Sequence, residues 1–380
     1  MHQEQRYRTH ELLKTKGVER ALFAHPGSVT WLTGFAPPIQ LGQNIFAGGP
    51  PLVWYEDGHF TLFVVDAYTA DTEEFSDQSD CAVVTHLGYT FEQPLSGSYH
   101  LAISLRQTLA SSSGFSGVVG IEERNVPLAL SSVVLDTLSS RAAVEGIDGW
   151  LEPLRMVKTS EELDKLRGNF ALADLGQATA RQAVLAGKKE IDVWNAIHSA
   201  IQHAAGRRVP LGNDCVVGQR SLNFTGWPLD YEIKPNGSLI VDIGTGLHGY
   251  WSDGCATYYP DEPTPQQAAM HKTAADALEL AISLIQPGMP VMEIDRQVRL
   301  LISNAGYPDY PHHTGHGIGA ASHEAPRIVP YSQKVLEEGM VVMLEPGIYI
   351  PSKTGVRLEV GLLVTADGAE VLSKHNKSLP

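Results

Sequence analysis

Cysteine is scarce in this chain. Cys81, Cys215 and Cys255 are the only three among 380 residues, and no pair has the short spacing of a zinc finger or a redox motif. This count argues against a secreted scaffold held by disulfides. The N-terminal residues are charged and lack the apolar segment of a signal peptide. We therefore expect a protein of a reducing compartment, the cytoplasm.

Long apolar runs and basic clusters are missing as well. No stretch approaches the roughly 18 uninterrupted apolar residues that a membrane-spanning helix requires. Lys and Arg total 28 against 43 Asp and Glu, which gives a formal net charge of −15. Because an acidic surface repels phosphate groups, neither nucleic acid nor an anionic membrane is expected as a partner.

The chain does contain enough apolar sequence for two domains. Its 380 residues exceed a typical domain, and 43% of them are hydrophobic. Strand-like runs at 62–65 and 118–121 alternate with helical patterns, whereas the later sequence is strongly helical. We predict an α/β (α+β) fold with domains at 1–152 and 153–380. The Pro- and Gly-rich segment 36–54 predicts a long loop, either a lid in a homodimer or a surface loop.

The second domain has the pattern of a duplicated unit. Capping boxes at Thr159 and Thr264 predict the starts of two long helices. The tripeptide Glu-Ile-Asp occurs at 190–192 and again at 293–295, and each copy begins a second helix. We therefore predict two related αα-ββ halves.

Acidic residues occupy matching places in these halves. Asp242 and Glu345 each end an apolar strand-like run, and Asp253 and Glu359 accompany the second strand of each half. His316 lies between glycines in GHGIG. Four carboxylates and one imidazole suit two divalent cations, which lower the pKa of a shared water and polarise a carbonyl. The pattern predicts a hydrolase.

Structural roles for the same residues stay open at this point. Asp253 lies in a turn-like Ser-Asp-Gly sequence, where an aspartate commonly caps the turn. A single histidine such as His316 is often a hydrogen-bonded structural residue, and its glycines could form a tight turn.

Five sequence blocks resemble a known family. VDIGTGLHGYWSDG, HHTGHGIG, HEAPRI, MLEPGIYIP and GVRLEV occur in this order and are similar to pita-bread-fold metallopeptidases, of the prolidase, aminopeptidase P and creatinase branch. The segment 29–35, VTWLTGF, is similar to a strand signature of the creatinase/prolidase N-terminal domain. The resemblance implies an N-terminal creatinase/prolidase-like α/β domain followed by a C-terminal pita-bread domain.

The resemblance also implies a role for individual residues. It implies five metal ligands: Asp242, Asp253, His316, Glu345 and Glu359. Glu345 is implied as the general base, His323 as the residue that stabilises the tetrahedral intermediate, and His312 as a contact to substrate. Arg357 matches a family arginine, and Arg327 is a second candidate for gripping a substrate carboxylate.

The sequence departs from the family pattern around the implied ligands. Thr225 stands where the family usually has a histidine, and its hydroxyl can bind substrate only as a neutral hydrogen-bonding group. Cys255 and Val360 also replace usual polar residues. These departures leave all five implied ligands in place.

Three functions follow from these observations. The first is a hydrolase with two divalent ions that cleaves Xaa-Pro dipeptides or N-terminal Xaa-Pro peptides. The second is a ring-opening or creatinase-like C–N hydrolase on a small metabolite, which the departure at Thr225 favours. The third is a non-catalytic pita-bread binding module. Manganese is the first expectation for the metal, and such a site also accepts cobalt, zinc or iron.

Overall fold

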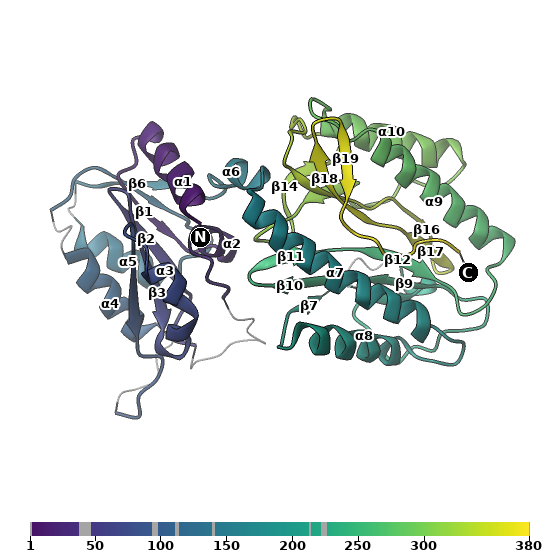
Figure 1. Cartoon of the computed structure of the whole chain (residues 1–380), viewed down its shortest axis with the longest axis horizontal. Coiled ribbons are helices and arrows are strands. Elements are labelled where there is room, and N and C mark those ends of the chain that lie inside the picture. Colours follow the sequence, from purple (N-terminus) through teal and green to yellow (C-terminus); the bar gives the residue numbers. More distant parts are fainter. Residues whose placement is uncertain are drawn as a thin grey trace. The chain divides into compact units, whose positions relative to one another are not determined.

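The chain divides into two compact units, unit 1 (Met1–Leu154) and unit 2 (Arg155–Pro380). The computed structural model describes residues 2–37, 47–92, 98–110, 114–138, 141–212, 214–221 and 226–379 (Figure 1). Within these ranges, no helix is both long and apolar enough to cross a bilayer. Residues 38–46 of the expected loop at 36–54 fall outside the described residues, and residues 52–54 at its end belong to a strand.

Unit 1 is built on a six-stranded mixed sheet. Its order is β4-β3-β2-β1-β5-β6. The strands are β1 (Arg20–Phe23), β2 (Leu52–Glu56), β3 (His59–Val65), β4 (Cys81–His86), β5 (Val118–Ile121) and β6 (Ala143–Gly146). β1, β2 and β3 pair antiparallel, whereas β3–β4, β1–β5 and β5–β6 are parallel. The strands expected at 62–65 and 118–121 are confirmed.

Helices connect these strands and cover the sheet. They are α1 (Gln3–Lys16), α2 (Pro26–Thr33), α3 (Glu73–Ser76), α4 (Tyr99–Leu109) and α5 (Leu128–Thr137), with a 3-10 segment η1 (Asp66–Thr72). Leu101, Leu105 and Leu109 of α4 recur at helical spacing and pack with Trp54 and Phe63 of the sheet. Burial of this apolar stripe holds the helix on the sheet.

The expected strand at 29–35 is wrong. These residues belong mainly to α2, which begins with Pro26 after a His25 side-chain cap and ends at Gly34 with φ 76°. Proline at the first helical position and a left-handed glycine after the last one are strong helix boundaries. The β-branched residues between them are buried, so tertiary packing outweighs their preference for strands.

The first half of unit 2 contains two helices and a series of short strands. After α6 (Glu152–Met156), which lies at the junction in the sequence, come α7 (Ser160–Ala183) and α8 (Glu190–Ala205). The following elements are β7 (Leu211–Gly212), β8 (Cys215–Val217), η3 (Gly218–Arg220), β9 (Leu239–Asp242), β10 (Gly244–Leu247), β11 (Tyr250–Ser252) and β12 (Cys255–Tyr258). The capping box of Thr159 is present at the start of α7.

The second half repeats this order. It begins with α9 (Pro265–Ser283), which carries the Thr264 capping box, and α10 (Val291–Asn304). The strands are β13 (Gly315–Gly317), β14 (Glu324–Ile328), β15 (Val341–Leu344), β16 (Gly347–Ile350), β17 (Thr354–Arg357), β18 (Val360–Thr365) and β19 (Gly368–Val371). The sheet order β12-β9-β8 of the first half matches β18-β15-β13 in the second. The predicted duplication is therefore confirmed.

Each half has its own apolar core. Val193, Ile197 and Ile201 of α8 pack on strands β8 and β9 of the first half. Ile294 and Val298 of α10 belong to the corresponding cluster of the second half. Figure 1 shows the strands of unit 2 lying between the two helix pairs. Strand ends that carry polar side chains can therefore meet at the centre of the unit.

Candidate metal centre

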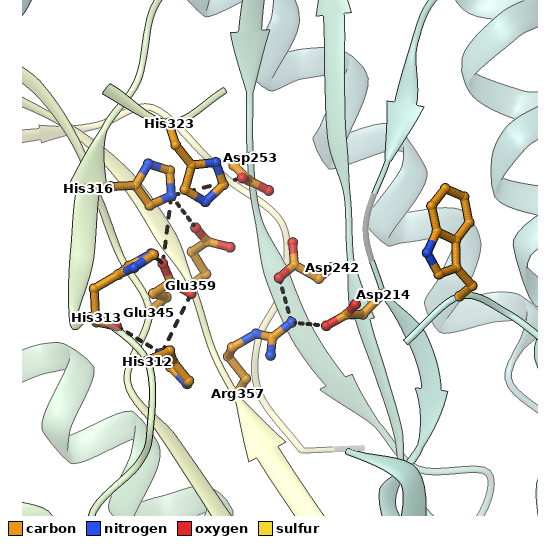
Figure 2. Close-up of a pocket in the computed structure, with 11 residues that line it drawn as sticks. Asp214, Asp242, Asp253, His312, His313, His316, His323, Glu345, Arg357 and Glu359 are labelled. Carbon is orange, nitrogen blue, oxygen red and sulfur yellow. Dashed lines mark hydrogen bonds and ion pairs between the residues drawn. The ribbon is translucent and has the colours of Figure 1, made fainter. Parts of the chain in front are cut away.

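One pocket of unit 2 collects most of the residues singled out in the sequence. Its volume is about 340 Å³. The lining residues are Asp214, Trp227, Asp242, Asp253, His312, His313, His316, His323, Glu345, Arg357 and Glu359 (Figure 2). All five implied metal ligands are among them.

The first half contributes two aspartates from neighbouring strands. Asp242 ends β9 and lies opposite Cys255 of β12 in the antiparallel register. Asp253 occupies the turn just before β12, where its Oδ1 accepts a hydrogen bond from the Gly254 amide at 3.0 Å. Both side chains are buried. The turn role considered for Asp253 is therefore real, but one carboxylate oxygen remains directed away from it.

The second half contributes His316 and two glutamates. His316 is the middle residue of β13, between β14 and β15. Glu345 follows the last residue of β15, and Glu359 lies between β17 and β18. The glycines beside His316 have a packing role: a Cβ on Gly315 would lie 2.0 Å from the Met343 carbonyl oxygen. Only glycine allows this strand to approach its neighbours so closely.

The ring of His316 is oriented for metal ligation. Its Nδ1 is 2.9 Å from the Gly317 carbonyl oxygen, which can only accept, so Nδ1 carries the proton. The lone pair of Nε2 then faces the acids. Nε2 lies 3.6 Å from Glu345 Oε1 and 4.0 Å from oxygens of Asp253 and Glu359. A carbonyl that fixes the tautomer in this way is a usual partner of a metal-bound histidine.

The acids at this centre need a positive charge between them. Burial, followed by repulsion from Asp242 and Glu345, raises the pKa of Asp253 well above its ordinary value. Burial and the charges of Asp253 and Asp242 likewise raise the pKa of Glu359. Among the described residues, Glu359 Oε2 is buried without a hydrogen-bond partner. Since an unpaired buried carboxylate is costly, this donor set fits divalent cations.

The ligand atoms are also close enough for a shared ion. One atom each from Asp253, His316 and Glu359 lies within 4.8 Å of the others. A second such group consists of His313, His316 and His323. The carboxylates and the single well-oriented imidazole match the oxygen and nitrogen ligands of manganese, cobalt, zinc or iron.

Arg357 is held by acids of the first half. Its Nη2 donates to Asp214 Oδ2 and Asp242 Oδ2, both at 2.6 Å (Figure 2). The guanidinium is buried, so these charge-assisted bonds fix it firmly. Asp214 was not singled out from the sequence. The available signal was an acid placed directly before the apolar run of β8.

His312 is held in one tautomer by a chain of hydrogen bonds. Its Nδ1 donates to the His313 carbonyl at 2.8 Å, and its Nε2 accepts from the Tyr349 hydroxyl at 2.8 Å. The Tyr349 oxygen accepts from Arg357 at 3.2 Å. Burial, followed by the charge of Arg357, lowers the pKa of His312 to about 3. This imidazole is therefore neutral at pH 7, and both of its nitrogens already have protein partners.

Two other histidines face the pocket beside His316. The His323 ring stacks on His316 with 3.9 Å between centroids and 14° between planes. His323 is exposed at the mouth, yet desolvation of its ring and the nearby His313 and Arg327 lower its pKa to about 4. His313 Nε2 lies 2.7 Å from Glu345 Oε1. His313 had been assigned no role from the sequence.

Comparison with known proteins identifies the family of the chain. The Metallopeptidase family M24 matches residues 164–366, and the Creatinase/Prolidase N-terminal domain matches residues 5–157. The chain belongs to metallopeptidase family M24. It is therefore a metal-dependent hydrolase with a creatinase/prolidase-type N-terminal domain, as the resemblance implied.

The chain is also similar to individual proteins that are named as dipeptidases. It is 33% identical to the Xaa-Pro dipeptidase of Pyrococcus furiosus over 234 residues, covering 61% of this chain and 67% of that protein. It is 30% identical to the putative dipeptidase YkvY of Bacillus subtilis over 271 residues, covering 68% and 75%.

Solved structures of the family share the whole fold. The prolidase from Pyrococcus furiosus has a TM-score of 0.80 at 26% identity and covers 97% of this chain and 99% of its own. The Xaa-Pro dipeptidase from Bacillus anthracis has a TM-score of 0.83 at 24% identity and covers 100% and 99%. The expected two-domain architecture is confirmed.

Two implied substrate contacts of the M24 domain are not part of the described pocket. Arg327 is exposed on β14, where it pairs in register with His316 but does not line the pocket. Thr225 lies outside the described residues. Trp227, two positions further along, does line the pocket and was not singled out as a site residue from the sequence.

Proposed function

We propose that this M24 enzyme hydrolyses the amide bond of Xaa-Pro dipeptides or of N-terminal Xaa-Pro peptides. The observation that carries the proposal is the meeting of four buried carboxylates and the Nε2 of the buried His316 in one pocket. The printed names of the relatives, an Xaa-Pro dipeptidase and a prolidase among them, support the choice of substrate. They do not favour the creatinase-like alternative or a non-catalytic module.

We propose that the five implied ligands hold two divalent ions. In chain order, these ligands are Asp242, Asp253, His316, Glu345 and Glu359. Bound there, the ions would lower the pKa of a shared water and polarise the substrate carbonyl. We propose manganese as the native metal, with cobalt, zinc and iron as ions that the same donors accept.

Other residues of the pocket would accept a proton, stabilise the developing charge and orient the substrate. Glu345 would accept the proton of the attacking water, because its carboxylate lies beside both His316 and His313. His323 at the mouth would donate a hydrogen bond to the oxyanion that develops on the substrate. Tyr349 holds His312, and Asp242 holds Arg357. From these fixed positions, His312 and Arg357 would orient the bound substrate.

Assays on metal-loaded protein test the proposal. The full chain, treated with chelator and reloaded with manganese, cobalt or zinc, should hydrolyse Ala-Pro, Gly-Pro or Ala-Pro-Ala. His316→Ala should lower kcat on the order of a thousandfold and reduce bound metal, since a ligand is removed. His198→Ala, on the exposed face of α8, is the matched control and should change neither.

The result also separates the alternatives. Turnover of creatine, cyclic amidines or N-acyl amino acids, with none of the Xaa-Pro peptides cleaved, would contradict the peptidase proposal. Less than one equivalent of metal and no turnover of any substrate would favour a binding module. We further propose a cytoplasmic homodimer, which light scattering and fractionation would test.

A further inference from the structure

Among the described residues, the lining of the pocket contains one apolar side chain. Five of the lining residues are carboxylic acids, four are histidines and one is arginine; the remaining one is Trp227. Within the described lining, an apolar part of a substrate can therefore find an apolar surface only at the Trp227 indole. That indole is 70% exposed, so much of its surface faces water when the pocket holds no substrate.

The backbone of Trp227 is anchored to buried acids on both sides. The amide directly before it donates to Asp214 Oδ1 at 2.7 Å, and its own carbonyl accepts from Arg220 at 3.2 Å. Two residues later, the Leu229 amide donates to Glu190 Oε2 at 3.0 Å. Since Asp214 and Glu190 are buried, the backbone that carries the indole is held in place.

The hydrogen bonds of Asp214 also connect the Trp227 segment to Arg357 in the pocket. Asp214 binds the segment of Trp227 through one oxygen and Arg357 through the other. Asp214 is the one carboxylate of the described lining that we do not assign to the metals. Each of its oxygens accepts one of these bonds and keeps a second lone pair for another donor. The α-ammonium of a peptide is such a donor and is attracted to carboxylates, so the N-terminal residue of a substrate should lie on the Trp227 side.

We propose that Trp227 determines specificity by contacting the side chain of the N-terminal residue, and that the enzyme prefers Xaa-Pro peptides with a large apolar Xaa. The proposal rests on the proposed function and names its substrate class. Leucine or phenylalanine at Xaa would cover the indole and lose water from two apolar surfaces, whereas glycine would leave the indole exposed.

A set of dipeptides tests this preference. The manganese-loaded full chain is assayed on Gly-Pro, Ala-Pro, Leu-Pro and Phe-Pro. We expect the kcat/KM ratio of Leu-Pro to Gly-Pro to exceed about tenfold, as partial burial of one apolar side chain suggests. Trp227→Ala should reduce this ratio by about tenfold, and Trp227→Phe should retain most of it. Tyr331→Ala is the control, because Tyr331 is 82% exposed but outside the lining.

Binding separates the failure of this inference from the failure of the proposed function. Calorimetry of the manganese-loaded chain with L-phenylalanine and with glycine needs no turnover. Tighter binding of L-phenylalanine that Trp227→Ala abolishes supports the inference, even if no dipeptide is cleaved. Selectivity ratios in turnover or in binding that Trp227→Ala leaves unchanged would overturn it. So would an equal loss of kcat/KM for all four dipeptides, which would place the indole against the shared proline.

Discussion

The two halves of unit 2 share a layout but contribute different chemistry. Each has two helices and a three-strand core in which β9 corresponds to β15 and β8 to β13. The first half supplies Asp242 and Asp253, which are short acids at strand ends. The second supplies the imidazole and two glutamates. A duplicated scaffold can therefore place different donors at matching positions around one centre.

The repeated Glu-Ile-Asp tripeptide also has different roles in the two halves. In the first half, Glu190 is the buried acid; it pairs with Arg220 and accepts the amide of Val217 at 2.7 Å. In the second half the buried acid is Asp295, which accepts from Arg299 at 3.0 Å. Both acids fix a loop that borders the pocket, but they occupy opposite ends of the tripeptide.

The largest expected effect comes from removing one acid of the metal centre from either half. Asp253→Asn and Glu359→Gln should each reduce bound metal, and kcat should fall on the order of a thousandfold, because the ions contribute several kcal/mol to the transition state. Metal analysis and steady-state assays measure both effects. The exposed Asp261→Asn serves as control. If only one of the two variants lost activity, the two halves would not both be needed for the metal centre.

A smaller effect is expected from the buried acids of the tripeptides. Glu190→Gln and Asp295→Asn should each lower the free energy of unfolding by about 1–3 kcal/mol, because each weakens the charge-assisted hydrogen bonds of a buried acid to a half-buried arginine. Denaturant titration measures this loss. Asp192→Asn, at an exposed capping position, is the matched control and should cost about 1 kcal/mol or less.

These two variants should differ in activity. Arg299, which Asp295 holds, donates to the His312 carbonyl at 2.6 Å, so Asp295→Asn should lower kcat in the residual folded enzyme. Glu190→Gln loosens the segment of Trp227 and should mainly change selectivity among Xaa-Pro peptides. Identical kinetic profiles for the two variants would mean that the halves are functionally equivalent.

The smallest effect concerns pH and the metal-free protein. The pKa of Glu359 is raised in the folded state, so above the unfolded value of about 4.3 the native state binds more protons. Its contribution to stability therefore falls as pH rises from there toward the raised pKa. The melting temperature of metal-free Glu359→Gln should exceed that of the wild type by a margin that grows from pH 5 to pH 8. A margin independent of pH would contradict the raised pKa assigned to this carboxylate.

Local signals in the sequence predicted much of this arrangement. The Thr159 and Thr264 capping boxes depend on residues three apart, and both helices begin where expected. The resemblance also identified four acids and one histidine as metal ligands, and all five line one pocket. By contrast, α2 was taken for a strand because its β-branched residues have strand propensity, whereas burial and the flanking proline and glycine determine its helix.

Local sequence signals could not predict residues whose role depends on tertiary contacts. Asp214 meets Arg357 across 143 positions of the chain, and no spacing rule connects them. Tyr349 similarly reaches both His312 and Arg357 only after β16 and β17 have paired. Arg357 was identified as a candidate, but the carboxylates that hold it were visible only in the folded unit.

The glycines around His316 determine which parts of the centre can change. A side chain at Gly315 would meet the Met343 carbonyl, and one at Gly317 would lie 2.1 Å from the Ala325 carbonyl oxygen. Collisions with backbone atoms cannot be relieved by repacking of side chains, so a substitution at either glycine would displace the histidine strand. Glu345 and Glu359 lie at strand ends, where turns can lengthen or tilt. Adaptation to an ion of another radius should therefore proceed through these turns, with the imidazole as the fixed reference point.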